Sequence, residues 1–234
     1  MPRPRSTSPD AILAAAFARF THYGFRRTSM EDIADEAGVS RAALYLHFRN
    51  KEEIFRSLSQ ALHEEALAGA RAALAPDGPL AARLAAALEA KNGRFLEVGA
   101  SPHGMELIDE SSRLCGDVGA GAERRFLDLV ADAFEGAERR GEIAATRVGL
   151  APREAAELLV RSARGLKQPG TTGAAYRKRV DAFLRVFLSG LGAVGARSTA
   201  SARAAGSEGA SRRSAAAARR RRSAGSRPVA TRRR

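Results

Sequence analysis

The 234-residue sequence has no tryptophan, a single cysteine and few aromatic residues. Because aromatic residues make up only 6% of the chain, its core must be mainly aliphatic. The single cysteine, Cys115, excludes an intrachain disulfide and is typical of a reducing cytoplasm. No apolar run approaches the ~20 residues that span a bilayer, and no charged segment followed by an apolar one opens the chain. We therefore expect neither a membrane partner nor a signal peptide.

Motifs of the common enzyme classes are also missing. The sequence holds no glycine-rich phosphate loop with lysine, no GxSxG and no HExxH. His103 and Glu106 share one face of a helix, where they would be metal ligands, polar residues at a helix start or part of a ligand pocket. Cys115 lies on an apolar stripe and is expected in the core. We expect no enzymatic activity, no metal and no cofactor.

Positive charge is concentrated at one end of the chain. The net charge is +13, but residues 196–234 hold twelve arginines and one glutamate, which leaves +2 for the other 195 residues. Bulk charge is therefore weak evidence for nucleic-acid binding by the folded part. We expect residues 1–7 to be a disordered arm and residues 196–234 a disordered arginine-rich tail. The tail is either a nonspecific DNA tether or an inessential extension.

A helix-turn-helix is predicted between Thr28 and Phe55. Apolar residues at helical spacing predict a helix that ends at Gly38, since glycine tolerates the left-handed backbone of a helix end. Ser40 is a suitable N-cap for a second helix over Arg41–His47. Two short helices joined by a tight Gly-Val-Ser turn place the second helix in the DNA major groove.

Several residues of this segment are candidate DNA contacts. Arg41 is suited to donate twice to a guanine or to clamp a phosphate, and Ala42 to contact a thymine methyl or to permit close approach. Free N–H groups at the start of the first helix of the helix-turn-helix offer a phosphate site beside Thr28 and Ser29. Lys51 lies in the first turn of the next helix, where a cation is unfavourable unless it faces a phosphate.

The segment also resembles a known family. The residues that carry the resemblance are Thr28-Ser29, Ile33-Ala34, Ala37-Gly38-Val39-Ser40, Leu44-Tyr45, His47-Phe48 and Lys51-Glu52, which are similar to the signature of the TetR family of bacterial transcriptional regulators. Ala42 departs from the family pattern, which often has glycine or proline there. The resemblance implies that Tyr45 and His47 touch the sugar-phosphate backbone, although His47 also suits a capping or core role. The DNA-binding residues are therefore expected to be Thr28, Ser29, Ser40, Arg41, Ala42, Tyr45, His47 and Lys51.

The remaining pattern is helical throughout and predicts an all-α fold. A three-helix DNA-binding domain over residues 8–55 is expected before a helical-bundle domain over residues 56–195, which binds an effector and dimerises. The fourth helix, from Lys51 to about Leu74, links the two domains. Glycines between Gly116 and Gly121 predict a loose connector between two shorter helices. The last two helices are expected over residues 152–167 and 174–194.

These observations favour a transcriptional regulator. The resemblance implies a homodimeric repressor in the cytoplasm, associated with the nucleoid and released from a palindromic DNA operator by a small apolar or amphipathic ligand. Two other classes stay open from the sequence. One is an enzyme on a helical bundle with an accessory DNA module. The other is an architectural protein that binds DNA through its arginine-rich tail and needs no effector.

Overall fold

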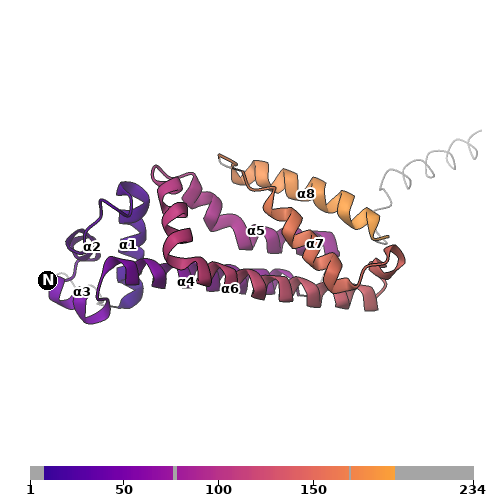
Figure 1. Cartoon of the computed structure of the whole chain (residues 1–234), viewed down its shortest axis with the longest axis horizontal. Helices are drawn as coiled ribbons and strands as arrows, with labels where there is room; N and C mark the ends of the chain where they lie inside the picture. The colour runs from indigo at the N-terminus through magenta and orange to yellow at the C-terminus, as the bar shows by residue number, and fades with distance from the viewer. Residues whose placement is uncertain (1–7, 76–77, 169, 193–234) are drawn as a thin grey trace, which may run out of the picture. The chain divides into compact units, whose positions relative to one another are not determined.

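The computed structural model describes residues 8–75, 78–168 and 170–192, and these ranges contain helices but no strand (Figure 1). The predicted arm over residues 1–7 and the predicted tail over residues 196–234 lie outside them. None of the described helices combines the length and apolarity needed to cross a bilayer. In chain order the elements are α1 (Pro9–Tyr23), α2 (Met30–Ala37), α3 (Arg41–His47), α4 (Lys51–Ala73), α5 (Leu80–Gly99), α6 (Gly104–Arg139), the 3₁₀ helix η1 (Ala145–Val148), α7 (Pro152–Arg164) and α8 (Gly173–Gly190).

Local capping interactions fix the start of each helix in the DNA-binding segment, and the cap predicted at Ser40 is confirmed. Ser29 accepts from the Asp32 amide at 3.1 Å, and the Asp32 carboxylate accepts from the Ser29 amide at 2.8 Å. The Ser40 side chain caps α3 by accepting from the Ala43 amide, and the Asn50 side chain caps α4 by accepting from the Glu53 amide. Gly38 ends α2 at φ 67°, in the left-handed region that favours glycine. Each of these caps joins groups only three residues apart, so the starts of the helices are specified locally.

Two hydrophobic clusters lie along the chain. The first joins α1, α2, α3 and the start of α4, and it continues into Leu107 and Cys115 of α6. The second joins the later part of α4 to α5, the second half of α6, α7 and α8. The boundary expected between residues 55 and 56 therefore falls inside α4, and Leu58 still belongs to the first cluster. The DNA-binding segment has no core separate from α4 and α6.

The loose connector expected at Gly116–Gly121 is wrong. Residues 116–121 are helical, but α6 consists of two helical segments joined at a kink at Cys115, where φ is −132° and ψ is 21°, one residue before the expected connector. Packing of α6 beside α4, which Figure 1 shows, and against α7 outweighs the low helix propensity of the glycines. α7 also ends earlier than expected, at Arg164, and the predicted end of α8 at residue 194 lies outside the described ranges.

Two glycines of α6 give opposite predictions for stability. A Cβ at Gly104 would lie 2.2 Å from the Val98 carbonyl oxygen, whereas one at Gly116 would meet nothing within 4 Å. We predict that Gly104→Ala lowers the free energy of unfolding by ~1–3 kcal/mol, as overpacking does. Gly116→Ala should raise it by ~0.5–1 kcal/mol, because alanine restricts the unfolded chain and suits a helix. Urea denaturation measures both, and a destabilising Gly116→Ala would contradict a helical backbone at Gly116.

Candidate DNA-binding surface and ligand pocket

The second helix of the motif, α3, has one buried side and one exposed side. Leu44 is fully buried and anchors α3 to α1 and α2. Arg41, Ala42, Tyr45 and His47 are all exposed, as a surface that enters a groove requires. The Arg41 guanidinium carbon lies 5.7 Å from the centre of the Tyr45 ring, within the range of a cation–π contact. Four of the predicted contact residues are thus exposed on α3, and Arg41 lies beside Tyr45.

Ser29 and Ser40 are exposed, but their hydroxyl groups already serve as caps. The Ser29 hydroxyl donates to Asp32 at 2.7 Å, and the Ser40 hydroxyl accepts from the Ala43 amide at 3.1 Å. A phosphate at either helix start would therefore be bound mainly by backbone N–H groups.

Thr28 does not have the exposed contact role that was expected. Its side chain is buried, with 1% of its surface exposed, and its hydroxyl donates to the Gly24 carbonyl at 2.7 Å. A buried hydroxyl that is already satisfied cannot reach an external phosphate. Thr28 instead closes the loop between α1 and α2.

Lys51 also has a role that the sequence did not predict. Its ammonium group donates to the carbonyl oxygens of Phe25, Arg26 and Thr28 at 3.0, 3.2 and 3.1 Å, and it lies 4.6 Å from the centre of the Phe25 ring. Three acceptors engage all three ammonium hydrogens. These contacts, and not a facing phosphate, explain a cation in the first turn of α4. Lys51 ties α4 to the loop that precedes α2.

The arginines before α2 are divided between two environments. Arg26 was a candidate phosphate contact, but its guanidinium is 3.1 Å from the buried carboxylate of Glu110 on α6. The Arg26 amide also donates to Glu106 at 2.9 Å. Arg113 binds the other oxygen of Glu110, and the two arginines lower the pKa of that carboxyl although burial opposes them. Arg27 is exposed.

The residues considered as metal ligands have structural roles. The imidazole of His103 is 3.5 Å from Glu106, whose other oxygen holds the Arg26 amide. Across the described residues, no three His, Cys, Asp or Glu side chains are placed to share a metal ion. Cys115 is buried, as expected, and burial raises the pKa of its thiol.

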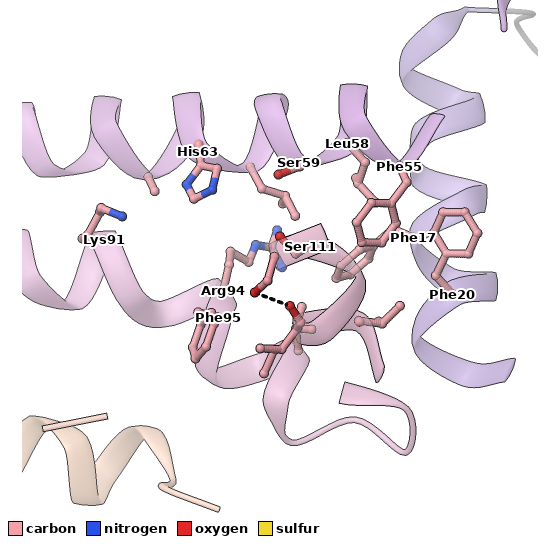
Figure 2. Close-up of a pocket in the computed structure, with 16 residues that line it drawn as sticks. Phe17, Phe20, Phe55, Leu58, Ser59, His63, Lys91, Arg94, Phe95 and Ser111 are labelled. Carbon is pink, nitrogen blue, oxygen red and sulfur yellow. Dashed lines mark hydrogen bonds between the residues drawn. The ribbon is translucent and has the colours of Figure 1, made fainter. Parts of the chain in front are cut away.

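A cavity of about 180 Å³ lies between α1, α4, α5 and the first half of α6 (Figure 2). Phe17, Phe20 and Phe55 line one end, and His63 and Lys91 line the other. The remaining lining residues are Leu58, Ser59, Leu62, Ala66, Arg94, Phe95, Val98, Leu107, Ile108, Ser111 and Ser112. The family resemblance implied a ligand pocket, but none of these residues was predicted to line it, because they come from four helices and share no motif.

Burial governs the titratable groups at the polar end. It lowers the pKa of the His63 imidazole, and Lys91 and Arg125 lower it further. Burial likewise lowers the pKa of Lys91, which Glu123 at 3.7 Å opposes. Beside them, burial and the charge of Lys91 lower the pKa of Lys167 to about 8. This end of the pocket therefore holds cations that are poorly solvated.

The exposed second helix, its capped turn and its shared core define a helix-turn-helix DNA-binding domain. Residues 12–58 match the family model described as "Bacterial regulatory proteins, tetR family". Over these residues the chain has a domain of this family, as the resemblance in the sequence indicated.

Curated relatives align mainly over this domain. The chain is 47% identical over 53 residues to the HTH-type transcriptional regulator TtgR of Pseudomonas putida, which is 23% of this chain and 25% of TtgR. It is 37% identical over 87 residues to the HTH-type transcriptional activator FasR of Mycolicibacterium smegmatis, or 37% of this chain and 40% of FasR. The chain thus spans about a quarter of the length of TtgR and two fifths of FasR.

Solved structures are similar over most of the chain and support the fold. SmeT, the repressor of the Stenotrophomonas maltophilia multidrug efflux pump SmeDEF, gives a TM-score of 0.56 at 23% identity, over 78% of this chain and 89% of SmeT. A transcriptional regulator from Cytophaga hutchinsonii gives 0.61 at 19% identity, over 78% and 97% of the two chains. The all-α architecture predicted from the sequence is confirmed.

The lowered pKa of Lys167 predicts a pH dependence of stability. Lys167 has a pKa of about 8 when folded, below the ordinary 10.5, so the unfolded chain binds more protons between these two values. The contribution of Lys167 to the free energy of unfolding should therefore rise with pH from about 8 to 10.5. Lys167→Met should flatten this rise in urea denaturation series, whereas the exposed Lys178→Met should not. Identical pH slopes in the wild type and Lys167→Met would contradict the shift.

Proposed function

We propose that this protein is a homodimeric transcriptional regulator that binds a palindromic operator as a repressor and is released by a small ligand. The observation that supports the proposal most directly is the position of Phe20 and Phe55. Both rings belong to the core of the DNA-binding domain, and both line the cavity. A ligand in this cavity would contact the DNA-binding domain itself.

In the proposed complex, α3 lies in the major groove of double-stranded DNA. Arg41 reads a guanine or clamps a phosphate, Ala42 permits close approach, and Tyr45 and His47 contact the sugar-phosphate backbone. The backbone amides beside Ser29 and Ser40 bind phosphates at the starts of α2 and α3. Thr28 and Lys51 act indirectly, by holding the loop before α2.

The proposed dimer forms through α7 and α8. Leu158 on α7 and Val186 on α8 are exposed large apolar side chains, at 47% and 77% of their surface. Phe183 and Phe187 pack against each other on α8, with ring centres 5.5 Å apart, and remain only partly buried. A second copy would cover these side chains. DNA recognition also requires a dimer, because one seven-residue helix reads few base pairs. Two-fold symmetry presents two α3 helices, one from each subunit, to half-sites ~34–36 Å apart.

The proposed regulation is a population shift between two conformers. The ligand favours the conformer whose two α3 helices do not match the half-site spacing. α4 carries the movement, since its first turns belong to the DNA-binding core and its later turns to the second cluster. The activator FasR carries a similar DNA-binding domain, so DNA occupancy and the sign of regulation need separate measurements.

Selection of bound DNA from a random pool tests the operator. We expect the full-length protein to enrich a palindrome. If Arg41 reads a base, Arg41→Ala should relax the preference at one symmetric position of the palindrome at a cost of ~1–3 kcal/mol in binding. A uniform loss of affinity across all sequences would instead make Arg41 a phosphate contact. The exposed Arg124→Ala on α6 is the matched control and should bind as the wild type does. No enriched palindrome would refute the proposal.

The dimer is tested by charge substitution on α8. Val186→Glu should place a charge in the proposed interface, shift the chain towards monomer in sedimentation velocity and weaken operator binding by at least tenfold. Val148→Glu changes an exposed valine of η1, which belongs to neither α7 nor α8, in the same way and should leave both properties unchanged. A Val186→Glu protein that stays dimeric would exclude this interface.

A further inference from the structure

The two ends of the cavity differ in chemistry (Figure 2). The end beside α1 presents the rings of Phe17, Phe20 and Phe55, and the opposite end presents Lys91 and His63. An apolar ligand would satisfy the first end but leave the second without a partner. A wholly polar ligand would lose the apolar contacts. The pocket therefore suits an amphipathic molecule in one orientation.

Positive charge at the polar end exceeds the negative charge available there. Lys91, Arg164 and Lys167 line one small hollow together with a single acid, Glu123. Arg164 is 3.1 Å from Glu123, whereas Lys91 is 3.7 Å away, beyond the ~3.2 Å of an ordinary hydrogen bond. The Lys167 ammonium lies over the Phe95 ring at 4.6 Å, beside the same lining.

The other charged groups near the cavity do not supply the missing anion. Arg94 also lines the cavity, but its guanidinium is 3.0 Å from Glu97 and 3.9 Å from Glu65, so its charge is compensated. Arg125 and Glu64 pair with each other at 2.7 Å. The lowered pKa of His63 keeps its imidazole neutral at pH 7. The surplus charge is thus that of Lys91 and Lys167.

Lys91 connects this surplus to the cavity. It lines both the cavity and the adjoining hollow, and its side chain is only 11% exposed. A poorly solvated cation with one distant partner is costly, and an anion that binds beside it relieves that cost. A lysine ammonium group acts as a point charge and suits a single anionic group such as a carboxylate, whereas bidentate recognition favours the planar fork of arginine.

We propose that the ligand of this pocket is a small amphipathic carboxylate. Its carboxylate binds Lys91, with Lys167 beside it, and its apolar chain extends towards Phe17, Phe20 and Phe55. The cavity of about 180 Å³ is smaller than the ~300–1,000 Å³ of typical drug-sized sites, which favours a medium-length chain. The inference rests on the proposed function for its regulatory meaning, but ligand binding can be measured without DNA.

Calorimetry on the full-length protein tests the ligand class directly. The probes are hexanoate, octanoate and decanoate, each compared at pH 7 with the alcohol of the same chain length. We expect at least one acid to bind at least tenfold more tightly than its alcohol. Lys91→Met should remove this preference and leave binding of the alcohol unchanged, whereas Lys178→Met, on the exposed surface of α8, should keep the preference. Acids and alcohols that bind equally to the wild type, or no binding of either series, would overturn the inference.

Further measurements keep the result interpretable. Circular dichroism shows whether Lys91→Met is folded; if it is not, Lys91→Gln replaces it, and the wild-type comparison of acid with alcohol needs no variant. Operator binding is measured separately with and without the preferred acid. An acid that binds through Lys91 but leaves operator affinity unchanged would refute induction and keep the ligand class. A protein that recognises the operator but shows no preference for the acid would refute the ligand class and keep the proposed DNA binding.

Discussion

The packing of three phenylalanine rings is the contact on which the rest of the structure depends. Phe20, Phe25 and Phe55 have ring centres 5.0 to 5.7 Å apart, and they join α1, the loop before α2 and the start of α4. Lys51 lies against Phe25 and holds the carbonyl oxygens of the same loop. Since Phe20 and Phe55 also line the cavity, the same rings belong to the core of the DNA-binding domain and form one end of the cavity.

A second connection reaches the DNA-binding domain from α6. Glu110 is buried between Arg26 and Arg113, and Glu106 accepts from the Arg26 amide. Both arginine side chains are largely exposed while Glu110 is buried, so the two arginines offset the cost of burying this carboxylate, and Arg26 joins the loop before α2 to α6. The kink at Cys115 separates this part of α6 from the part that packs with α7. The first half of α6 is therefore a structural element of the DNA-binding domain.

Local signals predicted the helix-turn-helix closely, and long-range contacts explain what they missed. Caps at Ser29, Ser40 and Asn50 and the left-handed Gly38 act within a few residues, and the end of α2 and the bounds of α3 were predicted as observed. Lys51 was taken for a phosphate contact because its three acceptors lie 23 to 26 residues away. Gly116–Gly121 looked like a connector because the helices that support α6 are distant in sequence. The pocket residues come from four helices, so no single segment indicated the surplus charge around Lys91.

The central claim is that the DNA-binding domain and the first half of α6 form one cooperative unit. Native-state hydrogen exchange tests it at the level of single amides. The account predicts that the amides of residues 107–114 open with the same free energy as the most protected amides of α1 and α2. If α1 and α2 open at a lower free energy while residues 107–114 stay protected with α7 and α8, the domain unfolds without α6 and the shared core does not govern its position.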